Sequence, residues 1–347
     1  MSVVYKKLED VCEILDSRRV PITAKDRKAG AYPYYGANGL QDYVADYIFD
    51  DELVLLAEDG GNFGSKERPI AYRVSGKCWV NNHAHVLKAK PNMHVDYLCY
   101  ALMFYDTEGL VNGATRQKLT QAAMRQMVIP YRDMTEQLQI IEKITQIVRS
   151  IEKRKEELQL LDQLVKSRFI ELFGDPIKNT QHRPTTAFVN VVTMQRGFDL
   201  PVQDREQSGN IPVYGSSGVL DHHNQSKACN GGVITGRSGT IGKVFYTRGA
   251  YWPLNTTLFS VDTHENNIIY LAHLLRMFNL ARFTEGTGVP TLNRNKFHSA
   301  PIIDVPIDEQ NQFAAFVEQT DKSKLAVQKG LQELEILKKS LMQQYFG

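Results

Sequence analysis

The stretch that decides the fold is present twice. It reads Thr135-Glu136-Gln137 and continues to Phe173-Gly174, and it reads again Asp308-Glu309-Gln310 and continues to Phe346-Gly347. The two copies align without a gap. Their separation is much longer than the period of a solenoid array, which is about 20–50 residues. The repeat therefore predicts a chain organised as globular unit, helix, globular unit, helix, with pseudo-two-fold symmetry.

The segments that precede the two copies also repeat. Pro33–Gly39 (PYYGANG) resembles Pro212–Gly218 (PVYGSSG), and Trp79–Asn82 (WVNN) resembles Trp252–Asn255 (WPLN). The two globular units are therefore expected to share one backbone design. A molecule with two similar halves suits a ligand or partner that also has two halves.

Both long copies have the apolar spacing of a coiled-coil helix. Apolar residues recur three and four positions apart, and Glu, Lys and Gln fill the other faces. Neither helix can bury its apolar stripe alone, so we expect the two to pair antiparallel within the chain. Packing of each helix on its own unit, or dimerisation, are the alternatives. The residues expected at the helix seam are Ile144, Ile151, Leu158, Leu161, Val165, Val327, Leu331, Leu334 and Leu341.

Local signals place the helix ends. Thr135 and Asp308 are expected as N-caps, and Gly174 is expected to end the first helix. The predicted boundaries are 1–133 and 177–306 for the globular units and 134–176 and 307–347 for the helices. At about 1.5 Å per residue, helices of about 40 residues would span about 60 Å.

Short apolar runs between Gly, Asn, Asp and Pro predict strands in the globular units. In each unit one helix is expected after these strands. The fold class is therefore α+β, with a mixed or antiparallel sheet in each unit. The expected strands are 48–56, 70–74, 233–235 and 243–247, and the expected helices are 97–105 and 268–280.

Composition is that of an ordinary water-soluble protein. The chain has 347 residues, 42% hydrophobic and 23% charged, with a net charge of +2. No apolar run approaches the roughly 18 residues that span a bilayer, and the segment from Met1 to Lys7 lacks the apolar centre of a signal peptide. None of the four cysteines forms a C-x-x-C pair. We therefore expect a cytoplasmic protein without a membrane partner, a disulfide or a zinc site.

No catalytic motif stands out. Gly236–Val244 looks like a phosphate-binding loop, but it has one residue too many between its glycines, and it is predicted to be a strand, a turn and a strand. His83-Ala84-His85 and His222-His223 have no carboxylate or Cys cluster that converges on them by spacing, so we expect surface or hydrogen-bonded histidines and no metal site. A site used twice would appear in both units, and none does.

Two Gly/Thr-rich loops in matching places carry basic and amide side chains. They are 112–120 and 285–294. Arg can pair with guanine and Asn or Gln with adenine, while Lys and Thr can hold phosphates. Ordinary solvated loops are the alternative. The candidate DNA-binding residues here and in the preceding turns are Arg116, Gln117, Lys118, Thr291, Asn293, Arg294, Lys296, Arg237 and Asn62.

The whole chain resembles the specificity subunit of a Type I restriction-modification system. The resemblance rests on the Pro-x-Tyr-Gly-x-x-Gly segment in both units, the Glu-Gln opening of both helices, and Lys166–Pro176 (KSRFIELFGDP) at the end of the first helix. It implies two target recognition domains, each reading half of a split double-stranded DNA sequence, separated by a helix pair of fixed length. Because the units differ in most surface residues, an asymmetric target is expected.

The resemblance also implies that the chain is not an enzyme and binds no cofactor. Two methyltransferase subunits would use S-adenosylmethionine, and two restriction or motor subunits would use ATP and magnesium. The alternative from another class is a non-catalytic scaffold whose paired globular ends bind protein or glycan. DNA retention that depends on the methyltransferase partner would distinguish the two.

Overall fold

The structure is a computed structural model that describes residues 3–113, 116–206, 208–286 and 290–347. Met1 and Ser2, Ala114 and Thr115 of the first predicted loop, and Thr287, Gly288 and Val289 of the second lie outside the described residues. Among the residues that are described, no helix combines the length and the apolarity needed to cross a bilayer.

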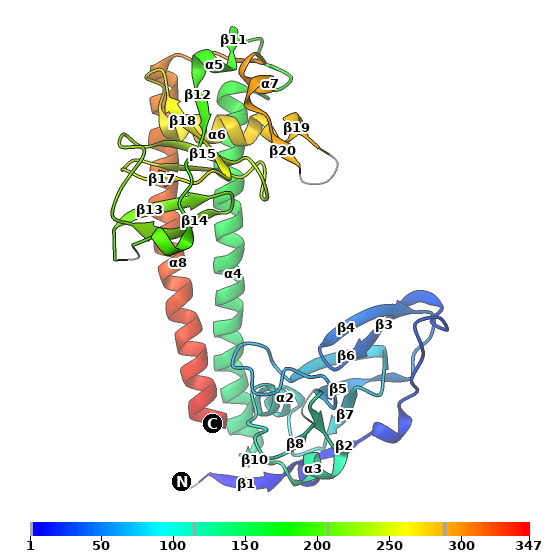
Figure 1. Ribbon diagram of the computed structural model, residues 1–347. Helices are drawn as coiled ribbons and strands as arrows, with labels where there is room; N and C mark the ends of the chain where they lie inside the picture. The colour runs from blue at the N-terminus through cyan, green and yellow to red at the C-terminus, as the bar shows by residue number, and fades with distance from the viewer. Residues whose placement is uncertain (1–2, 114–115, 207, 287–289) are drawn as a thin grey trace. The chain divides into compact units, whose positions relative to one another are not determined.

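The chain divides into two compact units, and each contains part of both long helices. Unit 1 comprises Met1–Arg154 and Gly330–Gly347, and unit 2 comprises Lys155–Lys329. The long helices are α4 (Met134–Phe173) and α8 (Ile307–Phe346), which Figure 1 shows in green and in orange to red. The sequence predicted four segments, two globular and two helical. The compact units do not test that division, since each combines a globular part with segments of both helices.

Unit 1 is built around a mixed sheet of six strands. The order is β2-β7-β5-β6-β3-β4, in which β3 and β6 are parallel and the other neighbours antiparallel. Two-stranded ribbons, β1 with β10 and β8 with β9, complete it. The elements are β1 (Val4–Lys7), α1 (Leu8–Val11), β2 (Cys12–Ile14), η1 (Asp16–Arg18), β3 (Ala29–Gly36), β4 (Gly39–Val44), β5 (Phe49–Ala57), β6 (Ala71–Val80), β7 (Ala84–Ala89), α2 (Val95–Met103), β8 (Val111–Asn112), β9 (Lys118–Leu119), α3 (Gln121–Gln126) and β10 (Val128–Tyr131).

Unit 2 repeats this plan with a divided sheet. Four strands lie in the order β12-β18-β15-β16, and three in the order β14-β13-β17. The single strand β6 of unit 1 corresponds to two shorter strands here, β16 and β17. The elements are β11 (Thr185–Ala187), α5 (Phe188–Val191), β12 (Thr193–Arg196), η2 (Val202–Asp204), β13 (Ile211–Gly215), β14 (Gly218–His223), β15 (Gly232–Gly236), β16 (Val244–Thr247), β17 (Trp252–Pro253), β18 (Thr257–Asp262), α6 (Ile268–Phe278), η3 (Leu280–Phe283), β19 (Thr284–Glu285), β20 (Thr291–Leu292), α7 (Arg294–His298) and β21 (Pro301–Ile303). The predicted α+β class is confirmed.

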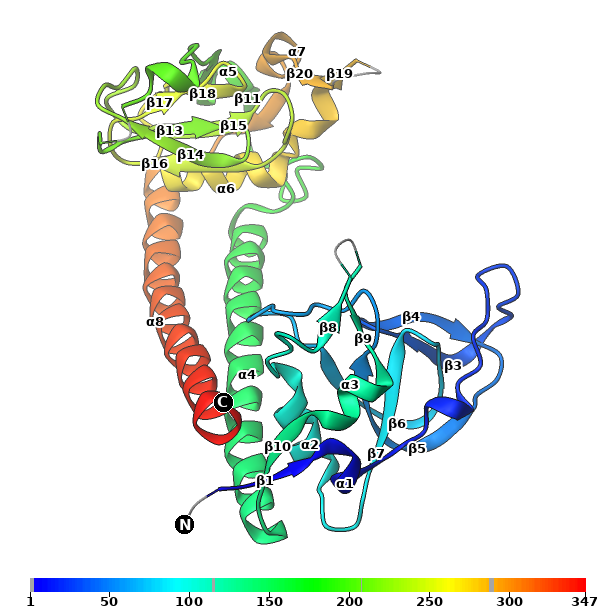
Figure 2. The ribbon, with the colours of Figure 1, turned by 60° about the horizontal axis from the view of Figure 1, so that its bottom comes forward.

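In each unit one short helix joins the sheet to the long helices. In unit 1, Tyr97 and Leu98 of α2 belong to the same buried core as Val54 of β5 and Ile144 of α4. In unit 2, α6 takes the same place between the sheet and the long helices, as Figure 2 shows. The apolar faces of these short helices are fully buried because they meet apolar surface on both sides. The core of each unit therefore includes residues of the long helices.

Contacts inside each unit show that α4 and α8 run antiparallel. In unit 1, Arg132, just before α4, donates to the carbonyl oxygen of Tyr345 near the end of α8 (3.2 Å). In unit 2, Asp162 in the second half of α4 pairs with Lys324 in the first half of α8 (2.7 Å). Antiparallel pairing within the chain is thus confirmed. Each helix also packs on its own unit, so that alternative proves to be part of the same arrangement.

The residues expected at the helix seam divide into two groups. Four are buried, and of these Ile144 and Val165 belong to the cores of units 1 and 2, respectively. The other two buried residues are Ile151 and Val327. The remaining five are half-buried: Leu158, Leu161, Leu331, Leu334 and Leu341. Part of the apolar stripe therefore belongs to the globular cores, and helix pairing through the other seam residues stays a prediction.

The expected helix caps need correction, whereas the expected stop is confirmed. Asp133 caps α4, because its carboxylate accepts from Glu136 N (2.9 Å), so Thr135 already lies in the first turn. Before α8, the carbonyl of Pro306 accepts the first helical bonds, so Asp308 is already the second residue of the helix and lies two residues past the cap. Gly174 follows α4 directly with φ of +73°, a conformation that glycine adopts without strain.

The repeated Glu-Gln opening of the long helices has a structural role. Gln137 is fully buried. Its Oε1 accepts from His94 N (2.8 Å), and its Nε2 donates to the carbonyls of Asn92 (3.1 Å) and Arg132 (2.8 Å). This glutamine therefore ties the start of α4 to the segment that leads into α2.

Gln310 does the same in unit 2. Its Oε1 accepts from Asn267 N (2.9 Å), and its Nε2 donates to Val305 O (2.7 Å) and Asn266 Oδ1 (2.6 Å). We call Gln137 and Gln310 the glutamine latches. They explain why the same dipeptide opens both helices.

Candidate nucleic-acid interface

In unit 1 the β8–β9 ribbon packs beside the turn that follows β5. Leu119 N donates to Glu58 O (2.7 Å), and Gly60 N donates to Gln117 O (3.1 Å). An isolated bridge joins Asp59 to Lys118. The predicted residues Arg116, Gln117 and Lys118 therefore lie against the 58–60 turn, held there by main-chain atoms.

Unit 2 repeats this main-chain frame. Leu292 N donates to Arg237 O (2.8 Å), and an isolated bridge joins Ser238 to Thr291. Arg237 N donates to Thr256 O (2.8 Å), just as Glu58 N donates to His83 O in unit 1 (2.9 Å). Position 237 of unit 2 is thus equivalent to position 58 of unit 1. The predicted strand, turn and strand around 236–244 is also confirmed.

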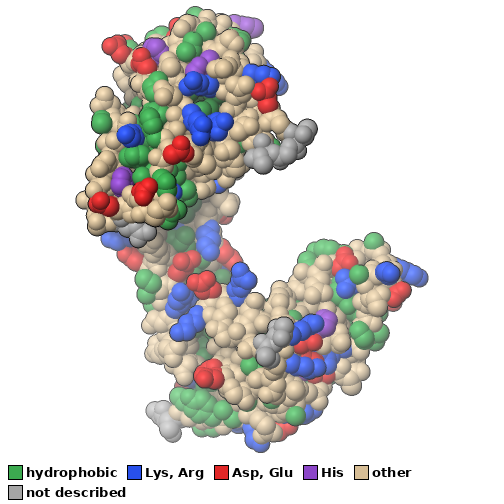
Figure 3. All heavy atoms as spheres, viewed as in Figure 1, with side chains coloured by type: hydrophobic (Ala, Val, Ile, Leu, Met, Phe, Trp, Pro, Cys, Tyr) green, Lys and Arg blue, Asp and Glu red, His purple; other side chains and the backbone are tan. Residues whose placement is uncertain are grey.

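The basic candidates of unit 1 are paired with acids on the turn. Arg116 Nη2 lies 2.7 Å from Asp59 Oδ1, and Lys118 Nζ lies 3.1 Å from Glu58 Oε1. His83 Nδ1 also contacts Asp59 (2.5 Å). Figure 3 shows basic, acidic and histidine side chains gathered together on this face of unit 1. Arg116 remains 61% exposed, so it can still reach a ligand.

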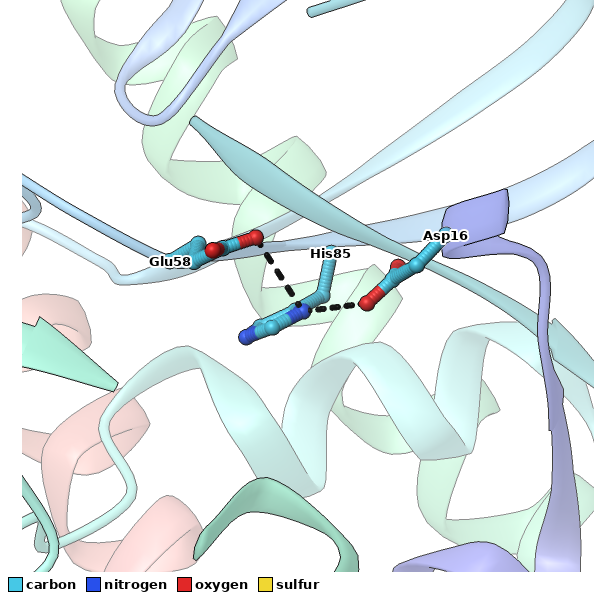
Figure 4. Close-up of side chains that lie close together, drawn as sticks. All are labelled: Asp16, Glu58 and His85. Carbon is cyan, nitrogen blue, oxygen red and sulfur yellow. Dashed lines mark hydrogen bonds and ion pairs between the residues drawn. The ribbon is translucent and has the colours of Figure 1, made fainter. Parts of the chain in front are cut away.

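Beneath this surface lies a buried charged cluster that the sequence did not indicate. The imidazole of His85 lies between two carboxylates, as Figure 4 shows, with Nδ1 at 2.6 Å from Asp16 and 3.6 Å from Glu58. Its Nε2 is 2.9 Å from Leu119 O. The expected hydrogen-bonded role of His85 is therefore confirmed, and its carboxylate partners are ones that sequence spacing could not reveal. Residues 16, 58 and 85 are distant in sequence and meet because β2, β7 and β5 are neighbours in the sheet.

The cluster has the donor types of a metal site, but protein cations already occupy its carboxylates. One ligand atom from each of Asp16, Glu58 and His85 lies within 4.8 Å of the others. Arg19 pairs with Glu58 (2.6 Å) and Asp16 (3.5 Å), and Lys118 pairs with Glu58. Buried carboxylates that are paired and hydrogen-bonded need no metal ion. The cluster therefore supports the turn and the ribbon from below.

The state of Asp16 agrees with this structural role. Burial favours the neutral acid, but the hydrogen bonds and charge of His85, with hydrogen bonds from Val86 N (2.9 Å) and Gln121 Nε2 (3.0 Å), outweigh it. The pKa of Asp16 is therefore held below its usual value. The carboxylate is charged when the cluster is formed, and it holds His85 and α3 in place.

The candidates of unit 2 have a different electrostatic setting. Arg237 and Arg294 are half-buried, and in the part of the chain that the structure describes their side chains have no hydrogen bond or ion pair. Lys296 and Asn293 both contact Glu285, and these bonds lower the pKa of that carboxyl. Thr291 lies in β20, and Asn62 of unit 1 lies half-buried in the loop after β5. The DNA-contacting roles of these residues stay predictions.

The second histidine pair agrees with its expected surface or hydrogen-bonded role. His222 is exposed, whereas His223 is buried, and its Nδ1 accepts from Glu206 N (3.1 Å). His223 also packs edge-on against Trp252. His223 therefore supports the loop before β13.

Unit 2 also contains a cavity of about 460 Å³ with both charged and apolar lining residues. His273 and Arg276 of α6, Asp162 of α4 and Lys324 of α8 line part of it. Burial, followed by the nearby positive charges of Arg276 and Lys324, lowers the pKa of His273 to about 3. His273 is therefore neutral in the folded unit at pH 7.

This lowered pKa predicts that acid destabilises unit 2. In the unfolded chain a histidine gains its proton near pH ~6.5, whereas folded His273 stays neutral down to about pH 3. The unfolded state therefore binds more protons between these values, and the free energy of unfolding falls as pH falls through that window. We expect His273→Gln to reduce this loss, measured as the urea midpoint at about pH 7.5 and about pH 5. His222→Gln, at an exposed position, is the control, and an equal pH dependence in His273→Gln and wild type would contradict the assignment.

Comparison with known proteins agrees with the repeated architecture. The family model described as "Type I restriction modification DNA specificity domain" matches the chain twice, at residues 2–161 and 190–336. A protein of Haemophilus influenzae named as a type I restriction enzyme specificity subunit is 25% identical over 351 residues, covering 95% of this chain and 90% of the relative. A protein of Mycoplasma pneumoniae named as a type I specificity subunit is 21% identical and covers 91% and 88%.

Solved structures of the same kind share the fold. The S subunit of a Type I restriction-modification system from M. genitalium superposes with a TM-score of 0.63 at 13% identity, covering 100% of this chain and 96% of that one. A chain from a structural study of a type I R-M system gives 0.62 at 14% identity, covering 100% and 99%. The family model covers most of the chain, in both units, and so the protein belongs to the Type I restriction-modification DNA specificity family.

Proposed function

We propose that this specificity subunit reads a split, asymmetric DNA sequence, with each unit contacting one half-site through its ribbon and the adjacent turn. The observation that carries the proposal is the repeated main-chain frame of Glu58 with Leu119 and Arg237 with Leu292. The same frame presents different side chains in the two units, so two different half-sites are expected. Because α4 and α8 each run through both units, their lengths are candidates for what sets the gap between half-sites.

The family assignment favours DNA over the protein or glycan ligand of the alternative scaffold hypothesis. The chain is a non-catalytic specificity subunit. Two methyltransferase subunits would therefore supply the chemistry with S-adenosylmethionine. In a restricting complex, two restriction or motor subunits would add ATP- and magnesium-dependent steps. In this proposal the chain itself binds none of these cofactors.

The experiment that tests the proposal is methylation mapping of the chain in complex with its methyltransferase partner. The complex would be given a library of DNA with randomised sequence, and modified adenines would be located. We expect a two-part, asymmetric consensus with a constant gap. Methylation without any consensus would overturn the proposal, and so would a continuous or palindromic one.

Arg116→Ala is expected to affect only the half-site read by unit 1. Arg116 is exposed beside the 58–60 turn, so its loss removes a candidate base or phosphate contact. A base contact would cost about 1–3 kcal/mol at one position, whereas a phosphate contact would weaken all sequences and reduce the salt dependence. The measurement is binding of the complex to the mapped target at several salt concentrations. Arg125→Ala, which removes another ion-paired arginine of unit 1, is the control.

Arg294→Ala should produce the corresponding effect only in the other half-site. Unchanged affinity, salt dependence and half-sites in both variants would show that these loops do not contact DNA.

A further inference from the structure

The equivalent positions 58 and 237 carry opposite charges on the same main-chain frame. Glu58 is clamped by Arg19 and Lys118, and its side chain is only 13% exposed. Arg237 has no such partner in the described part of the chain. Neighbouring positions differ in the same sense. In unit 2, Arg196 of β12 lies opposite Leu258 of β18. By the register of the two sheets, these positions correspond to Asp16 and His85 of unit 1, so a basic residue replaces an acidic one.

Arg237 combines a main chain held by hydrogen bonds with a guanidinium that, among the described residues, has no hydrogen bond or ion pair. Its N–H donates to Thr256 O and its carbonyl accepts from Leu292 N, both at 2.8 Å. The loop that follows is tightly folded: a Cβ at Gly236 would come within 1.8 Å of Thr240 O, and Gly239 has φ of +79°. The side chain therefore starts from a rigid point beside the ribbon. A guanidinium has five N–H donors, and within residues 208–286 and 290–347 those of Arg237 have no acceptor, so they can serve an external one.

We propose that Arg237 is a specificity-determining residue that reads a guanine in the half-site of unit 2. Guanine presents two acceptors, N7 and O6, in the major groove, and the planar guanidinium matches both. A rigid starting point favours a base contact, because base recognition requires exact placement, whereas phosphates can be reached by mobile side chains. This inference rests on the proposed function, since it assumes that the ribbons face DNA.

The same comparison assigns no such role to Glu58. Because its carboxylate is held by Arg19 and Lys118, unit 1 must read its half-site with other groups, and guanine at the equivalent place is not expected there. The two half-sites would therefore differ at the base that faces this position.

The test is methylation mapping of Arg237→Ala and Arg237→Lys in complex with the methyltransferase partner, on DNA randomised at every position of the wild-type consensus. For Arg237→Ala we expect guanine preference at one position of one half-site to fall by about 5- to 150-fold, with the other half-site unchanged. Arg237→Lys should keep part of this preference, because lysine can also donate to guanine. Arg248→Ala, another arginine of unit 2 that is 62% exposed and paired with Glu318, is the matched control.

Each outcome separates this inference from the proposed function. Weaker binding to all sequences with lower salt dependence would identify Arg237 as a phosphate contact and overturn the inference. An unchanged consensus would also overturn it, while leaving the proposed function intact. A wild-type complex without any consensus would instead remove the proposed function. If the alanine variant fails to fold, shown by lost circular dichroism, the lysine variant decides: unaltered preference for all four bases at every position overturns the inference.

Discussion

Phe169→Ala is expected to lower the free energy of unfolding of unit 2 by about 3–5 kcal/mol. Phe169 is fully buried at the point where α4, α8 and α6 meet. Its ring lies 5.0 Å from that of Phe173, 5.4 Å from Phe313 and 6.0 Å from Tyr270. Removing the ring would lose its transfer free energy and leave a cavity that rigid neighbours cannot fill.

Hydrogen–deuterium exchange in increasing denaturant would measure this effect, because it follows unit 2 separately from unit 1. The matched control is Leu164→Ala on the same helix, where the side chain is 48% exposed and a change of less than about 1 kcal/mol is expected. Equal effects of the two substitutions would show that the aromatic cluster is not the core that holds the helices to unit 2.

Replacing a glutamine latch by glutamate should be nearly as damaging, although the side chain keeps its size. Nε2 of Gln137 donates to two buried carbonyls, and a carboxylate would place a negative oxygen against both. At about 1–3 kcal/mol for each unsatisfied buried group, Gln137→Glu should cost about 2–6 kcal/mol. Gln310→Glu should destabilise unit 2 in the same way, because Gln310 donates to Val305 O and Asn266 Oδ1.

The chain provides a control for each latch on the same helix. Gln139 and Gln312 are exposed, so Gln139→Glu and Gln312→Glu repeat the chemical change without the buried contacts. Thermal unfolding would compare each pair. If both substitutions of a pair leave the melting temperature unchanged, the latch is not a source of stability.

The sequence predicted the elements better than the contacts between them. The repeat located the starts of α4 and α8 to within two residues, and the expected strands and short helices correspond to β5, β6, β15, β16, α2 and α6. Such patterns are local, because they reflect which face of an element meets apolar surface. The caps failed because Asp133 and Pro306 lie just before the positions that the repeat made prominent.

The charged cluster below the ribbon could not be predicted in this way. Asp16, Glu58 and His85 meet only through the register of β2, β7 and β5, which no local spacing encodes. The nearest signal was the pair Glu58-Asp59 directly before two glycines at a strand end. Likewise, the resemblance marked the Glu-Gln dipeptide without explaining it. The structure gives the reason for the dipeptide, since the Gln137 side chain is bonded to the main chain of His94 and Asn92.

Unit 1 is formed by two segments from opposite ends of the sequence, and this sets the order in which the two units can fold during synthesis. Domains generally fold from the N-terminus as the chain emerges from the ribosome. Unit 1, however, needs Gly330–Gly347, whose Phe346 packs against Tyr97, whereas every residue of unit 2 has been made by Lys329. The second unit in the sequence is therefore complete before the first. Until translation reaches the end of α8, the apolar surface of unit 1 that receives Met342, Tyr345 and Phe346 stays uncovered.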